Sequence, residues 1–296
     1  MSTNISAALV KELRERTGAG MMECKKALEI SKGDMEGAIE ELRKSGATKA
    51  GKKAGRIAAE GIVIIATSND SKHAAMVEIN SETDFVARDI NFTAFAKAVA
   101  ETALASKETD VSKLAALKLH GDTRTVEEAR QELVTKVGEN IQIRRIFFSN
   151  PSAATVGTYI HSNRIGVIVE LDTDNKDLAR DIAMHIAASR PIVISPENVP
   201  QDIVAKEKEI YMAQAATSGK PQDIIEKMVV GRLKKYLDEV SLVGQPFVKD
   251  PDMTIGSLLN KHRAKVIGFN RYEVGEGIEK IVEDFKEAVM SQVQGS

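Results

Sequence analysis

Residues Ser81-Glu82-Thr83-Asp84-Phe85-Val86-Ala87-Arg88-Asp89 decide how this chain of 296 residues is organised. A β-like run, Ala75–Asn80, precedes them, and a helical pattern begins at about Ile90. Asp84 and Phe85 therefore lie where a strand gives way to a helix, and such connections are exposed and often display binding groups. Local pattern alone favours the alternative that Phe85 turns inward and anchors the helix to the core, because large apolar residues are usually buried.

A second copy of this stretch occurs further along the chain. At an offset of 92 residues, Val77–Asn80 matches Val169–Asp172 and Ala87–Ile90 matches Ala179–Ile182, with six identical positions among 14. Self-similarity at a fixed offset predicts a duplicated structural unit. Chance similarity between two strand-turn-helix segments is the alternative.

The two copies differ most at Thr83–Val86, which becomes Asn175–Leu178 in the second copy. Phe85 aligns with Asp177. A residue needed for the core of the shared unit should have an apolar counterpart, and Phe85 has none. The comparison therefore predicts that Phe85 contacts something outside its own unit.

The order of elements around each copy supports the duplication. Ile62–Ala66 with Ala74–Ile79 predicts one β-hairpin, and Thr155–His161 with Arg164–Leu171 predicts another. A helix follows each hairpin, and each copy closes with a further helix and a strand. The closing strands are predicted at 141–146 and 265–272. These patterns predict an α+β fold with two repeated subdomains built on antiparallel sheets.

Helices are predicted before the first copy, at Ile5–Arg16, Met21–Ser31 and Met35–Lys44. Thr17–Gly20 should end the first helix and Gly46 the third. Such a small bundle has a modest core and should dock on another surface. The Gly-, Ala- and Lys-rich residues 45–56 predict a linker or a solvated helix, with an RNA-binding tail as the weaker alternative.

An insertion in the second copy has a helical pattern of its own. Pro200–Thr217 and Pro221–Val240 carry narrow apolar stripes, and Ser218-Gly219-Lys220 separates them with a helix-ending signal. Two helices of similar length joined by a tight turn predict an antiparallel hairpin. Its polar outer faces predict a projecting arm that contacts another molecule.

Composition excludes several classes of function. The 41 basic and 43 acidic residues nearly cancel, so net charge favours neither nucleic acid nor a membrane as the main partner. The single cysteine, Cys24, excludes an internal disulfide and a cysteine-based zinc cluster. A signal peptide and a membrane-spanning run are both missing from the pattern, which predicts a cytoplasmic protein.

Catalytic signatures are also lacking in the pattern. The five histidines are scattered without metal-ligand spacing, and His185 is predicted to be a satisfied, partly buried histidine. Gly18-Ala19-Gly20 and Gly275-Glu276-Gly277 lack the spacing of phosphate-binding loops. Asp84 and Asp89 could form a carboxylate pair, but Asp89 is better explained as an acid at a helix start. We therefore predict a protein that is not an enzyme and has no cofactor or metal.

Several stretches resemble one known family. Leu9–Leu28 resembles the opening signature of bacterial elongation factor Ts, and Thr83–Val86 resembles its second signature. Further matches are Gly138–Arg145, Ala183–Ala188, Val240–Phe247 and Val274–Glu279. The similarity covers the whole chain in the same order, and the longer segment Ser106–Thr125 is the one departure.

The resemblance implies a guanine-nucleotide exchange factor that acts in translation on elongation factor Tu, both GDP-bound and nucleotide-free. It implies that Thr83, Asp84, Phe85 and Val86 displace the partner's Mg²⁺. It assigns docking on the partner's G domain to Leu9, Val10, Leu13, Arg14, Thr17, Gly18, Met21 and Met22.

The same resemblance implies a division into domains. These are a ubiquitin-associated-like module with a basic linker (1–55), a first core subdomain (56–150), a second core subdomain (151–195 and 241–277), a hairpin arm (196–240) and a C-terminal helical module (278–296). The resemblance also implies that the arm is a candidate surface for homodimerisation. Two alternatives remain from the residues themselves: a scaffold or RNA-associated protein that uses the arm, and a metabolic α+β enzyme with an active site between the repeats.

Overall fold

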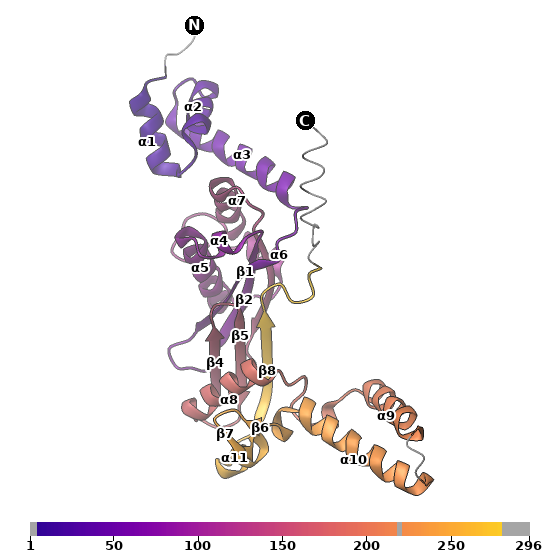
Figure 1. The fold of residues 1–296 in the computed structure, drawn as a ribbon. Helices are drawn as coiled ribbons and strands as arrows, with labels where there is room; N and C mark the ends of the chain where they lie inside the picture. Colours follow the sequence, from indigo (N-terminus) through magenta and orange to yellow (C-terminus); the bar gives the residue numbers. More distant parts are fainter. Residues whose placement is uncertain (1–4, 218–220, 280–296) are drawn as a thin grey trace.

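The protein is an α+β molecule with two small antiparallel sheets in its middle (Figure 1). The computed structural model describes residues 5–217 and 221–279. A helical bundle lies at one end of the elongated molecule, and a helical arm projects near the other end. The predicted fold class is confirmed.

The N-terminal bundle contains α1 (Ala7–Thr17), α2 (Met21–Ile30) and α3 (Met35–Lys53). The side chains of Ser6 and Asp34 accept hydrogen bonds from backbone N–H groups and cap α1 and α3. Gly18 ends α1 with a φ of 68°, a left-handed conformation that glycine adopts without strain. The bundle has a small core of its own, made by Val10, Leu13, Ala19, Cys24, Ala27, Leu28 and Ala38.

The prediction that Gly46 ends the third helix is wrong. α3 continues to Lys53 and includes most of the stretch predicted as a linker or solvated helix. Gly46 is buried where α3 meets α7 (Val126–Val137), and a Cβ atom there would lie 3.2 Å from Thr135 Oγ1. The glycine thus allows a close helix contact, and Ala50 is buried in the adjoining core. Packing against α7 stabilises helical turns that local propensity alone does not favour.

The first copy is a sheet with the strand order β1–β2–β3. Its strands are β1 (Glu60–Thr67), β2 (Ala74–Ser81) and β3 (Gln142–Phe148). Every residue of the central strand β2 is buried. The helices of this copy are α4 (Asp84–Ala87), α5 (Ile90–Ser106), α6 (Val111–Ala116) and α7. α5 packs on β1 and β2, and α6 lies in the long segment for which the sequence pattern predicts no element.

The second copy is a sheet with the strand order β4–β5–β8. Its strands are β4 (Thr155–His161), β5 (Ile165–Leu171) and β8 (Val266–Glu273), and α8 (Lys176–Ser189) packs on β4 and β5. Ser162 and Asn163 form the turn between β4 and β5 with positive φ angles of 51° and 55°. Both predicted hairpins are confirmed.

The two copies share one irregularity and one cap at aligned positions. The closing strand has a bulge opposite the central strand, where the register shifts after Glu78 in the first copy and after Glu170 in the second. Thr83 caps α4 and Asn175 caps α8, and each bonds to the backbone N–H three residues later, at 3.4 and 3.1 Å. A shared bulge and a shared cap support duplication over chance similarity.

The copies diverge immediately after this cap. α8 is continuous, whereas the first copy ends one helix at Ala87 and starts another at Ile90. After this interruption the buried residues of the two copies follow an offset of 90 and no longer 92. The buried set Phe92, Phe95 and Ala96 corresponds to Ile182, His185 and Ile186. The identical Arg-Asp-Ile residues of the two copies are therefore not structural equivalents.

The two sheets pack face to face. Gly166 of β5 lies against β1 and β2, and a Cβ atom there would approach Val63 Cγ1 to 2.4 Å and Met76 Sδ to 2.9 Å. The core between the sheets also contains Ala74, Ala153, Val156, Ile168, Tyr272 and Val274. The absence of a side chain at Gly166 allows this close approach of the two sheets.

A buried carboxylate joins the two copies. Glu78 is fully buried, and its Oε1 accepts hydrogen bonds from Arg144 Nη1 (3.0 Å) and from the backbone N–H of Gly275 (2.8 Å). Its Oε2 accepts a hydrogen bond from Arg145 Nε at 2.5 Å. The Arg145 guanidinium lies 4.0 Å from the centre of the Tyr272 ring. This network links β3 of the first copy to the end of the second.

The predicted helical hairpin is confirmed. α9 (Gln201–Ala216) and α10 (Gln222–Val240) contact each other and project from the second sheet (Figure 1). Their contact is a separate small cluster made by Tyr211, Ala215, Ile225 and Val229. The predicted turn at 218–220 and residues 280–296 of the predicted C-terminal module lie outside the described residues.

The second copy has further short elements, and the sequence pattern predicts only the last of them, the closing helix. They are two 3₁₀ helices, η1 (Pro196–Asn198) and η2 (Leu242–Gly244), the strands β6 (Pro246–Phe247) and β7 (Asp250–Thr254), and the helix α11 (Ile255–Lys261). Leu242, Phe247 and Ile255 from these elements are buried in the core beneath α8. They close the side of that core from which the arm departs.

Candidate functional site

The connection between β2 and α5 is a sharp corner that is capped on both sides. Thr83 is the N-cap of α4 and has extended backbone angles (φ −123°, ψ 158°). α4 is a single helical turn that ends at Ala87, with Arg88 as its C-cap. Asp89 then caps α5 by accepting hydrogen bonds from the N–H groups of Asn91 (2.8 Å) and Phe92 (3.2 Å). A cap on each side restricts the backbone around α4.

Phe85 points away from this corner into solvent. It is 82 % exposed, whereas Ala87 is buried and Val86 packs against the core of the first copy. In a single helical turn only some side chains can point at the core, and here these are the side chains of Val86 and Ala87. The interpretation that Phe85 anchors the helix is therefore wrong, and its exposure agrees with the comparison of the two copies.

Asp84 lies beside Phe85 and is only loosely engaged. Its Oδ2 accepts a hydrogen bond from Arg88 Nη2 at 2.9 Å, and the Arg88 side chain is largely in solvent while that of Asp84 is about half exposed. An exposed pair four residues apart on a helix is worth less than about 1 kcal/mol. A binding partner could therefore replace Arg88 at little cost, which leaves Asp84 available.

Asp89 has a structural role within the corner. The hydrogen bond from the Asn91 side chain, followed by those from the N–H groups of Phe92 and Asn91, holds the pKa of Asp89 below its usual value. Asp89 is thus an ionised helix cap, and the prediction of an acid at a helix start is confirmed. A shared proton between Asp84 and Asp89 has no support in this arrangement.

Ile90 is a second exposed apolar residue at this corner, and the sequence pattern does not single it out. It is the first residue of α5 and is 77 % exposed. Its identity with Ile182 suggests a core position, because Ile182 is fully buried. The interruption after α4 removes Ile90 from the buried face of the helix. The exposed pair Phe85 and Ile90 is called the apolar corner below.

Glu139 is another residue of the site that the sequence pattern does not reveal. Its carboxylate accepts hydrogen bonds from Thr83 Oγ1 (2.6 Å) and from the Thr83 backbone N–H (3.0 Å). The only sequence signal is its place directly after Gly138, which ends α7 with a positive φ of 81°. That signal marks the end of a helix, and says nothing of a contact with residue 83.

The N-terminal residues predicted to dock on a partner divide into two groups. Val10 and Leu13 are buried in the bundle core and are not available to a partner. Met21 and Met22 are 55 % and 73 % exposed, and Arg14 and Gly18 are exposed as well. Leu9 and Thr17 are half-buried. Direct contact is therefore open to the exposed group, and Val10 and Leu13 shape the surface from beneath.

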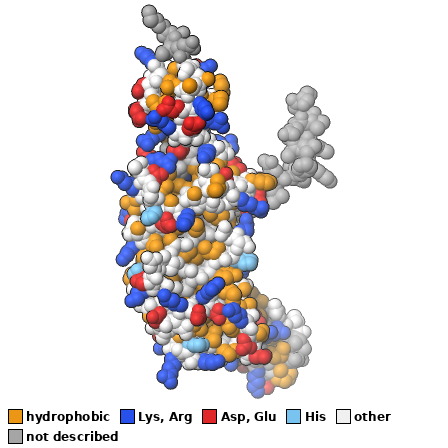
Figure 2. All heavy atoms as spheres, turned by 90° about the vertical axis from the view of Figure 1, so that its left-hand side faces the viewer, with side chains coloured by type: hydrophobic (Ala, Val, Ile, Leu, Met, Phe, Trp, Pro, Cys, Tyr) orange, Lys and Arg blue, Asp and Glu red, His pale blue; other side chains and the backbone are white. Residues whose placement is uncertain are grey.

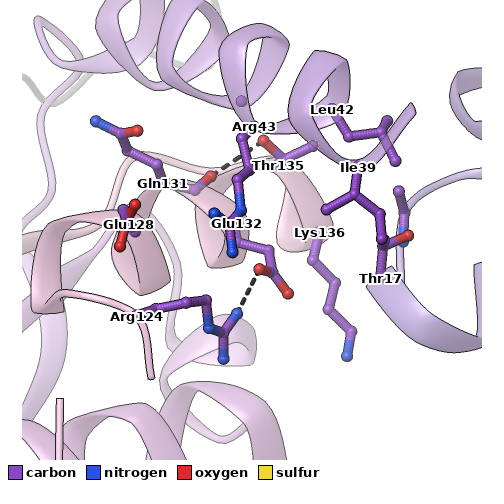
Figure 3. A pocket seen from close by; sticks show the side chains of 12 residues that line it. Thr17, Ile39, Leu42, Arg43, Arg124, Glu128, Gln131, Glu132, Thr135 and Lys136 are labelled. Carbon is purple, nitrogen blue, oxygen red and sulfur yellow. Dashed lines mark hydrogen bonds and ion pairs between the residues drawn. The ribbon is translucent and has the colours of Figure 1, made fainter. Parts of the chain in front are cut away.

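A groove lies where the N-terminal bundle packs against α7 (Figure 3). Ile39 and Leu42 line it from α3, and Thr135 and Lys136 line it from α7. Arg124 and Glu132 also line it and pair with each other, and Arg124 pairs in addition with Asp122. The hydrogen bond from Arg124 lowers the pKa of Asp122 to about 2. Arg124, Asp122 and Glu132 neutralise one another, so none of the three is left unpaired to bind a ligand. We therefore interpret the groove as a contact between two parts of the chain.

The part of the chain that the structure describes has neither a metal-binding cluster nor a membrane-spanning helix. Over residues 5–217 and 221–279, no group of three or more His, Cys, Asp or Glu side chains is placed to hold a metal ion. Within the same ranges, no helix combines the length and apolar character needed to cross a bilayer. The most prominent surface features near the corner are the exposed apolar side chains and Asp84.

Known proteins resemble this chain along nearly its whole length. The family model described as "Elongation factor TS" matches residues 82–276, which include the corner. The elongation factor Ts of Thioalkalivibrio sulfidiphilus (strain HL-EbGR7) is 61 % identical over 293 residues, covering 99 % of each chain. The elongation factor Ts of Legionella pneumophila (strain Paris) is 57 % identical over 294 residues, covering 99 % of this chain and all of that protein. That of Francisella tularensis subsp. novicida (strain U112) is 54 % identical over 293 residues with the same coverage. The chain therefore belongs to the elongation factor Ts family of translation elongation factors.

Proposed function

We propose that this chain binds elongation factor Tu in its GDP-bound form and promotes release of GDP, so that GTP can rebind. The observation that carries the proposal is the exposed Phe85 beside Asp84 on a capped helical turn. A large apolar side chain displayed in solvent contributes favourable free energy when a partner buries it. Thr83 caps this turn, and Val86 packs the turn against the core of the first copy.

The proposed mechanism acts on the partner's Mg²⁺. A GTP-binding protein holds GDP through a phosphate loop and a Mg²⁺ ion that offsets the phosphate charge. The Phe85 ring, wedged between helices of the partner's G domain, shifts the segments that present the Mg²⁺ ligands. Asp84 adds a carboxylate that engages displaced polar groups and repels the phosphates. Loss of the ion then weakens the hold on GDP.

Such exchange is a coupling between two binding events. GDP and this protein each lower the affinity of elongation factor Tu for the other by the same factor, because the free energies around a closed binding cycle sum to zero. A coupling of about 4 kcal/mol changes affinity roughly 1,000-fold. The cycle forms and breaks no covalent bond, so the proposal requires no catalytic side chain and no cofactor.

The N-terminal bundle supplies a second contact in this proposal. Met21 and Met22 present exposed, flexible apolar side chains, and Arg14 and Gly18 are exposed in the same bundle. Methionine adapts well to a partner surface. This contact anchors the complex, and the corner at Phe85 distorts the G domain. The arm formed by α9 and α10 is a further contact, either with a second copy of this chain or with the partner.

Charge distribution supports a protein partner over RNA. Basic and acidic side chains are interspersed over the face shown in Figure 2. Two lysines of the basic stretch are already engaged, since Lys49 pairs with Glu23 and Lys53 donates to the carbonyl of Gly138. RNA binding depends on clustered, free basic groups and falls steeply with salt. A filter-binding titration at several salt concentrations tests this alternative.

The deciding experiment is stopped-flow release of a fluorescent GDP analogue from purified elongation factor Tu. We expect addition of this protein to accelerate release in a saturable manner. The acceleration should diminish when EDTA has already removed Mg²⁺. An unchanged release rate at saturating protein would refute the proposal.

A further inference from the structure

We propose that Glu139 and Asn140 form a clamp that sets the direction of Phe85 and ties the corner to the end of α3. Both are positioning residues, and neither needs to touch the partner. This inference rests on the proposed function, because it explains how the corner is held ready for GDP release. Its geometric part can be tested on the isolated chain.

Glu139 controls the cap of α4. Its Oε2 accepts the backbone N–H of Thr83, and its Oε1 accepts the hydroxyl proton of Thr83 at 2.6 Å. With its proton directed at Glu139, the Thr83 hydroxyl has a lone pair free for the N–H of Val86 at 3.4 Å. Hydrogen bonds to a carboxylate are stronger than those between neutral groups. Glu139 therefore orients the hydroxyl that starts the turn carrying Phe85.

Asn140 joins the same corner to the end of α3. Its backbone N–H donates to Glu82 Oε1 at 2.6 Å. Its side-chain Nδ2 donates to the carbonyl oxygens of Arg56 (2.8 Å) and Ala54 (3.4 Å), directly after α3. Arg56 in turn lies 3.6 Å from Glu82 Oε2. Residues 54–56, 82–83 and 139–140 thus form one hydrogen-bonded unit.

The clamp has a consequence for the whole chain. α3 runs without a break from the N-terminal bundle to Lys53, whose side chain donates to the carbonyl of Gly138 next to the clamp. The bundle and the corner are therefore connected by a helix and a hydrogen-bonded joint, and not by a flexible linker. Binding through the bundle then presents Phe85 in a set direction, which reduces the conformational freedom lost on association.

The second copy shows what the clamp adds. Asn175, which takes the place of Thr83, lies against His262, with Nδ2 3.5 Å from Nδ1, and has no glutamate of the Glu139 type among its described hydrogen-bond partners. Its helix α8 is continuous and long, so a single cap suffices to start it. α4 has only four residues and cannot stabilise itself. A short turn that displays a side chain needs external support, and Glu139 provides it.

The first test measures the geometry without a partner. Hydrogen exchange of the backbone amides of Val86–Asp89 is compared in the full-length protein and in the Glu139→Ala and Glu139→Gln variants. We expect Glu139→Ala to accelerate exchange at these amides about tenfold, equivalent to about 1.4 kcal/mol. Glu139→Gln, which keeps an acceptor for the Thr83 hydroxyl, should have a smaller effect. Unchanged exchange in both variants overturns the clamp.

The second test measures GDP release from elongation factor Tu. Glu139→Ala should lower the saturated release rate about tenfold, while the protein concentration for half-saturation changes less than about threefold, under about 0.7 kcal/mol. Thr83→Val should add little to Glu139→Ala, because both act through one hydrogen-bonded pair. Val99→Ala, a change in the buried face of α5 away from the corner, serves as a control for lowered global stability and should keep the saturated rate.

The two tests separate the inference from the proposed function. Faster amide exchange with a lowered release rate supports both. Faster amide exchange with an unchanged release rate refutes the role of the corner in GDP release and leaves the clamp as a structural device. If Val99→Ala lowers the saturated rate as much as Glu139→Ala does at equal stability, the positioning role of Glu139 is wrong.

Discussion

Ile90 and Ile182 are identical residues at aligned positions of the two copies, yet Ile90 is 77 % exposed and Ile182 is fully buried. The difference arises from the break between α4 and α5, which α8 lacks. The break changes the helical phase after Ala87, so that Phe92 takes the core position and Ile90 faces solvent. One break in a duplicated helix thus converts a core segment into a surface that displays Phe85 and Ile90.

The first prediction concerns Ile90 and Ile182 as a matched pair. Ile90→Ala should change the free energy of unfolding by no more than about 0.5 kcal/mol, as expected for a surface site. Ile182→Ala should cost about 2–5 kcal/mol, because it opens a cavity beneath α8. Urea titrations of both variants measure the difference. Equal costs would show that the two isoleucines are structural equivalents after all.

The second prediction concerns Phe85. Phe85→Ala should leave the free energy of unfolding within about 0.5 kcal/mol of the parent, while stimulated GDP release slows markedly. Phe92→Ala, at the fully buried phenylalanine of α5, is the matched control and should cost about 3–5 kcal/mol. The defect of Phe85→Ala should shrink in EDTA, because the variant lacks only the means to displace Mg²⁺. A sharply lowered melting temperature with unchanged release would place the function elsewhere.

The third prediction concerns the joint between the two copies. Glu78→Ala removes the common partner of Arg144 and Arg145 from a fully buried site, and breaking such a pair costs about 3–5 kcal/mol. Glu276→Ala removes a half-exposed partner of Arg145 and should cost under about 1 kcal/mol. Thermal unfolding of the two variants compares them. A small loss for Glu78→Ala would show that the sheet interface holds without this network.

The fourth prediction concerns pH and His185. Its Nδ1 accepts the N–H of Val248 at 3.2 Å, so Nε2 carries the proton and donates to Gln245 Oε1 at 3.0 Å. Burial lowers the pKa of His185, with the bond to Gln245 opposing the shift only in part. The folded pKa then lies below the unfolded value of about 6.5.

The sign of the effect follows from proton linkage. Between the two pKa values the unfolded chain binds more protons than the folded one, so stability falls as pH drops below about 6.5. At higher pH this contribution is complete. His185→Gln should flatten the difference between urea midpoints measured at about pH 7.5 and about pH 5.5. An unchanged difference would assign the acid sensitivity to other groups.

The fifth prediction concerns the arm. Its apolar contacts form a cluster separate from the sheet cores, so replacing residues 203–235 by a short turn should leave the core folded. Residues 238–240 are retained because the carbonyl of Glu239 accepts a hydrogen bond from Gln245 Nε2 at 2.7 Å. Circular dichroism should show the loss of the arm's helices with a preserved cooperative transition, and sedimentation should show whether self-association depends on the arm. Global unfolding of the shortened chain would make the arm a core element.

Much of this architecture could be predicted from sequence pattern. Short runs rich in Val, Ile and Ala, separated by polar turn residues, mark both hairpins, because such runs favour strands. The apolar stripes on 201–216 and 222–240 mark the arm in the same way, through helical periodicity. These signals are local, since neighbouring residues of one element carry them.

The site could be predicted only in part. The mismatch between Phe85 and Asp177 predicts an exposed phenylalanine, because a shared core would demand a shared apolar residue. The exposure of Ile90 could not be predicted, because Ile90 follows a break in the helical phase. The contact of Glu139 could not be predicted either, because its partner Thr83 is 56 residues away in the chain. The burial of Val10 and Leu13 among the predicted docking residues likewise depends on how three helices pack.

By itself the sequence determines the two repeated strand–cap–helix units, because each depends on residues that are close in the chain. Only the tertiary structure decides that α3 continues through Gly46, that α4 stops after one turn, and that Glu139 supports Thr83. The continuation of α3 and the support of Thr83 depend on contacts between segments that are distant in the chain, and such contacts can outweigh a local preference of about 1 kcal/mol. The displayed corner is therefore a property of packing, and the repeat on which it is built is a property of the sequence.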